Sequence, residues 1–316
     1  MTQDDQQRTR QGILLAVAAY TMWGIAPIYF KSLSEVSPFE ILSHRVVWSF
    51  FLLAFLLHMS RGWRKVRDTL TSKPKMLYLV ATSILVGANW LIFIWAVNSN
   101  HMLDASLGYY INPLINVLLG MFFLGERLRK LQWFAVSLAA IGVIIQLIAF
   151  GSVPIVAIAL AFSFGFYGLL RKKVSLEAQT GLFIETLVML PIAATYLLFI
   201  ADSATSDFSM NPMQLNLLLV AAGVITTVPL LCFTGAATRL KLSTLGFFQY
   251  IGPSLMFLLA VLIYGEAFTS DKAITFAFIW GALGFSALMV CVTTRRTNAL
   301  SCNTDRFLQD NPLIRR

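Results

Sequence analysis

The sequence predicts an all-α integral membrane protein with ten transmembrane helices, arranged as two inverted-topology repeats of five helices each. Three observations lead to this prediction. Of the 316 residues, 58% are hydrophobic and only 12% are charged, whereas soluble domains carry about 25% charged residues. The apolar residues fall into runs long enough to span a bilayer, and one long motif occurs twice. This composition excludes a water-soluble enzyme, because a single soluble core could not bury so much apolar surface.

Ten apolar runs are candidates for membrane-spanning helices, because a helix that crosses the hydrocarbon core needs about 20 mostly apolar residues. They lie at residues 12–31, 40–59, 76–97, 103–124, 131–150, 153–170, 180–200, 215–236, 243–264 and 272–293. Only short loops and two tails remain, which leaves no room for a soluble catalytic domain. The expected divisions are an N-terminal cytoplasmic tail 1–11, a first repeat 12–150, a second repeat 151–293 and a basic cytoplasmic tail 294–316.

The positive charges predict the orientation of these spans. Of the 24 lysine and arginine residues, 21 lie in the two tails and in the loops after spans 2, 4, 6 and 8. If the spans alternate in direction, all of these segments lie on one side of the membrane. By the positive-inside rule that side is the cytoplasm, so we expect a multi-pass protein of a bacterial-type inner membrane with both termini cytoplasmic. The net charge of +9 is then a topology signal that also suits anionic lipid, and no nucleic-acid partner is expected.

A motif shared by spans 4 and 9 indicates an internal repeat. Span 4 contains SLGYYINPLINVLLGMFFLGERL and span 9 contains TLGFFQYIGPSLMFLLAVLIYGEAF. In each copy a proline, Pro113 or Pro253, is followed after eleven residues by Gly-Glu, and the copies are offset by 140 residues from the prolines onward. Five spans per half is an odd number, so the second half must enter the membrane from the opposite side. Inverted repeats of this kind are typical of secondary transporters, whose substrate site lies near the membrane midplane.

Five long strings carry a resemblance to a known family. They are GILLAVAAYTMWGIAPIYFK, ILSHRVVWSFF, NWLIFIWAVN, SLGYYINPLINVLLGMFFLGER and STLGFFQYIGPSLMFLLAV. With them the sequence resembles the RarD-type members of the EamA branch of the drug/metabolite transporter superfamily, over about residues 12–296. The resemblance implies a ten-helix, two-repeat inner-membrane carrier of a type often named for a chloramphenicol-related phenotype. It implies neither a substrate nor the position of a substrate or ion site.

Polar and aromatic residues near the middle of several spans predict a cavity at the midplane. The candidates are Asn89, Trp90, Tyr110, Asn112, Thr226, Gln249 and Tyr250. Pro113 and Pro253 each lack an N–H, so we expect helix breaks there that free the carbonyls of Tyr109 and Gln249. Freed groups must face protein or water rather than lipid. The alternative is packing, in which the polar residues join helices and the prolines are simple kinks.

Three ionisable residues are expected inside the membrane. His44 and Arg45 lie about five residues from the outer end of span 2, and Glu185 lies about five residues inside span 7. They are candidates for contacts with substrate or protons, or they are satisfied by neighbours and by snorkelling. Arg45 and Glu185 correspond at the 140-residue offset, but we expect them not to pair, because they lie near opposite faces. Glu126 and Glu266, where their helices leave the membrane, are expected to cap a helix or tie a loop.

Together these features predict a secondary transporter that moves a small metabolite or drug-like solute, in the direction of export, by alternating access around the midplane cavity. The sequence contains no Walker A motif and no metal-ligand or nucleophile spacing, so we expect no cofactor, no metal site and no catalytic residue. The alternatives are an integral-membrane enzyme, which the scatter of His44, His58 and His101 disfavours, and a non-transporting receptor or scaffold. The expected partners are the small-molecule solute and membrane lipid, with a homodimer open as an alternative to a monomer.

Overall fold

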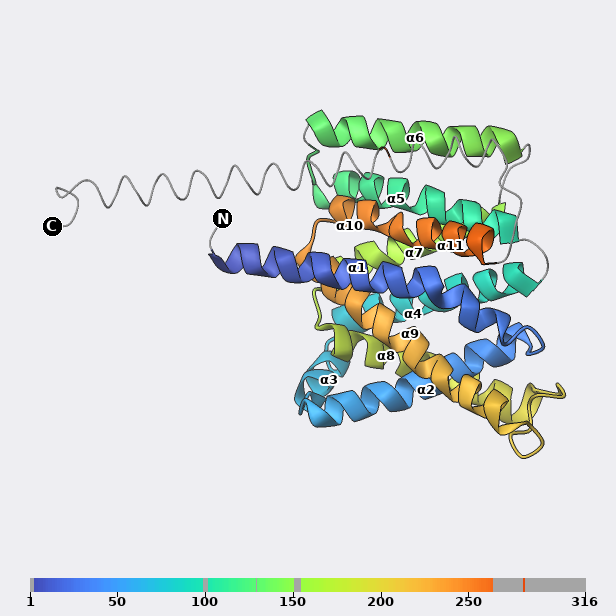
Figure 1. Cartoon of the computed structure of the whole chain (residues 1–316). Helices are drawn as coiled ribbons and strands as arrows, with labels where there is room; N and C mark the ends of the chain where they lie inside the picture. Colours follow the sequence, from blue (N-terminus) through green and yellow to red (C-terminus); the bar gives the residue numbers. More distant parts are fainter. Residues whose placement is uncertain (1–2, 99–101, 129, 151–154, 264–280, 282–316) are drawn as a thin grey trace.

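The computed structural model describes residues 3–98, 102–128, 130–150, 155–263 and 281 of the chain. Every regular element in this part of the chain is a helix. The helices are α1 (Gln3–Lys31), α2 (Pro38–Met59), α3 (Trp63–Leu70), α4 (Lys73–Asn98), α5 (Met102–Leu124), α6 (Lys130–Phe150), α7 (Ile155–Val174), α8 (Ala178–Thr195), η1 (Tyr196–Ile200), α9 (Met213–Arg239), α10 (Leu242–Gln249) and α11 (Ile251–Leu262). The long helices form a bundle in which α9 is visibly inclined to α1 (Figure 1).

The described helices have the lengths and composition of membrane spans. Six are long and apolar enough to cross a bilayer: Asp4–Lys31, Pro38–Met59, Lys73–Ala96, Ile155–Val174, Ala178–Ile200 and Met213–Arg239. Two shorter apolar helices cover Gly108–Leu124 and Gln132–Ile145. Each coincides with a predicted span, and α10 and α11 together occupy the predicted ninth. The predicted tenth span, 272–293, lies outside the described residues apart from Gly281.

The outer surface of the bundle is apolar. Large side chains such as Phe122, Ile148 and Phe199 are 78%, 74% and 81% exposed, respectively. A soluble monomer rarely exposes many such residues together, because contiguous apolar patches promote association. Lipid tails solvate these side chains, so the surface agrees with a multi-pass membrane protein.

Three segments near helix ends differ from the sequence-based prediction. The expected N-terminal tail is helical from Gln3 and continuous with the first span. The loop after the second span contains an extra helix, α3, which buries Val66 and Thr69 and exposes its basic side chains. Helix α7 continues to Val174, so Arg171 is helical and not part of a basic loop as predicted. Its side chain is 1% exposed, because it turns into the bundle toward a carboxylate.

The two proline-containing spans pack against each other but differ in shape. Helix α5 runs through Pro113 without interruption, which corrects the expectation of a break there. The other span divides into α10 and α11 at Tyr250, three residues before Pro253. Because Pro253 cannot donate to the Gln249 carbonyl, this turn lacks one helical hydrogen bond. On the α5 side the Tyr250 hydroxyl donates to the carbonyl of Tyr110 at 3.4 Å, a hydrogen bond that joins the two proline-containing spans.

Helices from the first and second parts of the chain interleave. Helix α1 packs on α9 and α11, α2 on α8 and α9, α4 on α7 and α8, and α5 on α7 and α10. Glycines permit close approach at two of these crossings. A Cβ atom on Gly223 would lie 2.6 Å from the backbone of Trp48, and one on Gly246 would lie 2.9 Å from the carbonyl oxygen of Pro113. Small residues at such points let helix backbones come together in a membrane.

Candidate functional site

A cavity of about 90 Å³ lies between the helices. Its wall is formed by residues of α1, α2, α4, α5, α7, α10 and α11, so helices from both predicted halves contribute. Along α1 the wall extends from Tyr20 to Phe30, about 15 Å at the 1.5 Å rise of a helix. The wall is mainly apolar, with seven aromatic residues, and it includes three amides and one arginine. An apolar wall with a few placed polar groups is typical of a small-molecule site.

The cavity brings together four of the seven residues that were predicted to line one. These are Asn89, Trp90, Asn112 and Gln249, and both Arg45 and Pro253 also line it. The other three predicted residues are buried outside this wall. Tyr110 and Tyr250 pack together with Val143, and Thr226 lies behind Arg45. Pro113 likewise lies outside the wall, at the contact with Gly246.

Arg45 is the charged group of the cavity. Its Nε donates to the Thr226 hydroxyl at 2.8 Å. Its guanidinium carbon lies 4.6 Å from the ring centre of Trp90 and 5.3 Å from that of Phe30. The side chain is 7% exposed, so the expectation that it snorkels to the interface is not the arrangement seen here. Two aromatic faces stabilise the cation through their quadrupoles.

The amides of the wall differ in how well their hydrogen-bonding groups are satisfied. Asn89 donates to the Leu160 carbonyl at 3.0 Å and to the Ser163 hydroxyl at 2.9 Å, which fixes its orientation. Gln249 accepts from Asn116 at 2.8 Å. Asn112 is 3% exposed, and within the described part of the chain its Oδ1 has no hydrogen-bond partner. Asn112 therefore offers an unused acceptor at the cavity.

Apart from Trp90, the aromatic residues of the wall were not predicted. They include Tyr20, Trp23, Phe30, Tyr109 and Phe164. The rings are in contact, with the centres of Trp23 and Phe164 5.6 Å apart at an interplanar angle of 81°. Residues 20, 23, 27 and 30 share one face of α1, because their spacing of three and four residues follows the helical repeat. That spacing was the available signal, but aromatic residues in an apolar span are equally suited to lipid.

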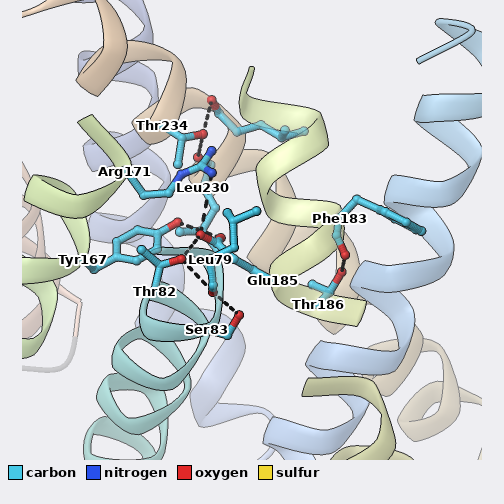
Figure 2. A network of polar contacts seen from close by, with 11 residues as sticks. Leu79, Thr82, Ser83, Tyr167, Arg171, Phe183, Glu185, Thr186, Leu230 and Thr234 are labelled. Atoms are coloured by element: carbon cyan, nitrogen blue, oxygen red, sulfur yellow. Dashed lines mark hydrogen bonds and ion pairs between the residues drawn. The ribbon is translucent and has the colours of Figure 1, made fainter. Parts of the chain in front are cut away.

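A second polar cluster surrounds Glu185, outside the cavity (Figure 2). Thr82 donates to Glu185 Oε1 at 2.6 Å, and the Tyr167 hydroxyl donates to Oε2 at 3.3 Å. Arg171 Nη1 lies 3.7 Å from Oε1, and both side chains are 1% exposed. Gly181 makes room for the arginine, because a Cβ there would lie 1.7 Å from Arg171 Nη1. The sequence pointed to Glu185 but missed Arg171, Tyr167 and Thr82 as its partners.

The structure gives Arg45 and Glu185 separate partners, as their predicted depths implied. Arg45 bonds to Thr226, whereas Glu185 bonds to Thr82 and Tyr167. A void of only about 10 Å³ is lined by Glu185 and by two residues that contact Arg45, Trp90 and Thr226. His44 lies 5.2 Å from Phe208, centre to centre, and neither of its ring nitrogens has a hydrogen-bond partner among the described residues.

Glu126 caps a helix, as expected for a carboxylate at the end of its span. Its oxygens accept from the N–H groups of Leu242 and Ser243 at 2.7 and 3.0 Å, and from the Ser243 hydroxyl at 2.6 Å. These are free N–H groups at the start of α10, where a negative charge is favourable. Glu266, its counterpart in the repeat, lies outside the described residues.

Comparison with known proteins agrees with this architecture. The EamA-like transporter family matches residues 10–148. An uncharacterized transporter of Vibrio cholerae is 76% identical over 279 residues, or 88% of this chain and 92% of the relative. Protein RarD of Salmonella typhi is 62% identical over 292 residues, or 92% of this chain and 99% of the relative. A crystal structure of a protein with 19% identity matches with a TM-score of 0.68 over 88% of this chain and 98% of that chain, so the fold is shared. The chain therefore belongs to the EamA-like transporter family, as a RarD-type membrane transporter of bacteria.

Proposed function

We propose that this protein is a secondary transporter that exports a small organic solute across the bacterial inner membrane, by alternating access around the central cavity. The observation that carries the proposal is that both predicted halves of the chain contribute residues to the cavity wall. Asn112 comes from α5 and Gln249 from α10, which correspond to each other in the two predicted halves. A site at the interface of two inverted repeats is the arrangement by which many secondary transporters expose one site to each face in turn.

The helix contacts support two repeats related by a two-fold exchange. The exchange relates α1, α2, α4 and α5 to α7, α8, α9 and the α10–α11 pair. Under this exchange the contact of α1 with α9 corresponds to the contact of α7 with α4, and the contact of α2 with α9 corresponds to that of α8 with α4. The contact of α5 with α7 corresponds to the contacts of α1 with α10 and α11. All of these contacts occur. The proposed motion rocks one half against the other, with the cavity between them.

The volume of the cavity limits the size of the solute. Drug-sized ligands occupy cavities of about 300–1,000 Å³, whereas this one has about 90 Å³. In this conformation it suits a solute no larger than about one ring with a polar substituent, and a larger solute requires the halves to move apart.

Two-sided access to the cavity tests the proposal without a known solute. The experiment uses full-length protein in which the three native cysteines are replaced by alanine. Met256 of α11 lines the cavity, and Met256→Cys places one thiol there. Leu258→Cys is the matched control on the same helix, because Leu258 is 38% exposed on the apolar surface and a thiol in lipid does not ionise.

We expect a charged, impermeant methanethiosulfonate to modify Met256→Cys in right-side-out vesicles and also in inverted vesicles, and to leave Leu258→Cys unmodified in both. Modification from one face only would fit a receptor or a membrane-embedded enzyme with a fixed pocket, and would contradict alternating access. Protection from both faces would remove the cavity from the transport path.

A further inference from the structure

The cation of Arg45 has no anionic partner in the part of the chain that the structure describes. Its contacts there are a neutral hydroxyl, on Thr226, and the faces of Trp90 and Phe30. No described aspartate or glutamate lies within 4.0 Å of its guanidinium, whereas the other buried arginine, Arg171, has Glu185 at 3.7 Å.

A buried charge without a counter-ion is unfavourable, because desolvation is compensated only by hydrogen bonds and an opposite charge. Cation–π contacts and one hydroxyl compensate only part of this cost. Arg45 is part of the cavity wall, and among the described residues only its Nε has a hydrogen-bond partner. An arginine fork held in this way matches the planar, bidentate geometry of a carboxylate or a similar oxyanion.

We propose that the solute is a small organic anion with a flat apolar body, and that Arg45 binds its anionic group. This inference rests on the proposed function, and it assigns the class of substrate to the same cavity. The solute completes the ion pair that the protein itself leaves open.

The rest of the wall matches the body of such a solute. Trp23 and Phe164 meet edge to face and present ring surfaces, which suit an apolar group. The Asn112 Oδ1 and the Tyr20 hydroxyl are buried and have no hydrogen-bond partner among the described residues. These two residues line the same cavity as Arg45 and are the candidates for binding a polar substituent on the solute.

The negative charge of the proposed solute also agrees with export. The cytoplasm is electrically negative relative to the outside, so the membrane potential drives an anion outward. An anion carrier in this direction needs no coupled ion, and Glu185 is then a structural carboxylate bonded to Thr82 and Tyr167. If a protein carboxylate were permanently paired with Arg45, the solute would have to displace that carboxylate before it could bind.

Efflux of a permanently charged aromatic anion tests the inference. Full-length protein is reconstituted into liposomes loaded with radiolabelled benzenesulfonate, and a potassium gradient with valinomycin makes the interior negative. We expect protein-dependent efflux that the potential accelerates. Arg45→Gln should reduce this efflux at least tenfold, and Arg45→Lys should retain an intermediate rate because it keeps the charge but not the fork. Lys65→Gln removes an exposed cation instead and should leave the rate unchanged.

Competition on the unmodified protein keeps the test decisive if Arg45→Gln does not fold. Excess unlabelled benzenesulfonate should slow efflux of the label, whereas its neutral isostere benzenesulfonamide and the cation phenyltrimethylammonium should not. Equal competition by the neutral isostere, or an unchanged rate in folded Arg45→Gln, overturns the inference. Absence of benzenesulfonate efflux, with two-sided labelling of Met256→Cys retained, also overturns it while leaving the transporter proposal standing.

Discussion

The hydroxyl of Tyr250 donates a hydrogen bond to the main-chain carbonyl of Tyr110 at 3.4 Å, and each tyrosine lies three residues before the proline of its own span. Close by, the Asn116 amide donates to the side chain of Gln249 at 2.8 Å. Polar contacts therefore join α5 to the α10–α11 region beside the cavity. All four residues are buried, and one of them, Gln249, belongs to the cavity wall.

The Asn116–Gln249 hydrogen bond separates a structural effect from a transport effect. Alanine at either position breaks the bond, but only Gln249 lines the cavity. We expect a double-mutant cycle to give a coupling of about 0.5–1.5 kcal/mol in unfolding free energy, the usual net value of a hydrogen bond. Gln249→Ala should reduce solute flux more than Asn116→Ala at equal membrane abundance. Equal fluxes would contradict a direct role for Gln249.

Asn112 supplies an acceptor that no described residue uses. Replacing Asn112 should therefore affect solute binding more than the stability of the fold. We expect Asn112→Ala to lower solute flux while the thermal midpoint of the purified protein changes little. Membrane abundance, measured by immunoblot, is the control. Normal flux at normal abundance would mean that Asn112 contributes to helix packing and not to solute binding.

The buried pair of Arg171 and Glu185 should matter for stability far more than an exposed pair. Removing one partner of a buried pair costs about 3–5 kcal/mol, because the other charge is left uncompensated. The matched control is Lys65–Glu177, whose atoms are 2.6 Å apart but whose side chains are 66% and 50% exposed; such pairs contribute about 0–1 kcal/mol. We expect Glu185→Ala to lower the unfolding midpoint in detergent strongly and Glu177→Ala hardly at all. Similar shifts for the two variants would refute the described burial.

Arg45 and Glu185 should behave independently. Each has its own hydrogen-bond partners, and sites that share no partner usually add within about 0.3–0.5 kcal/mol. We expect the stability changes of Arg45→Gln and Glu185→Gln to sum in the double variant. A coupling above about 1 kcal/mol would mean that the two groups communicate through the residues between them, such as Trp90 and Thr226.

The all-helical membrane fold and most of the polar groups of the cavity wall followed from the sequence, for physical reasons. Polar and charged groups are rare in apolar spans, so Arg45, Asn89 and Asn112 stood out. Aromatic residues gave no such contrast, because rings suit lipid, core and cavity equally. Arg171 was taken as a loop charge because it begins a run of three basic residues at the end of a span. Its burial depends on α7 continuing for one more turn and on Gly181 of α8, a tertiary relationship that span counting does not contain.

The orientation of the bundle is open to a direct check. The loop between η1 and α9, which contains the exposed Ala204, and helix α3, which the exposed Thr71 follows, lie at opposite ends of the bundle (Figure 1). In the cysteine-free background, Ala204→Cys should react with an impermeant thiol reagent on intact spheroplasts, and Thr71→Cys only after permeabilisation. This expectation follows from the positive-inside rule, because the basic loops lie at the same end of the bundle as α3. Reversed labelling would overturn the cytoplasmic assignment of the N-terminus.

The most direct test of the account asks whether the solute occupies the cavity. The measurement is the rate at which a small methanethiosulfonate modifies Met256→Cys in purified, reconstituted protein, with and without a saturating concentration of benzenesulfonate. If the anion binds between Arg45 and the aromatic wall, modification slows severalfold with benzenesulfonate and is unchanged with benzenesulfonamide. An equal rate with and without the anion, in protein that still carries out benzenesulfonate efflux, would place the transport path elsewhere and contradict the account.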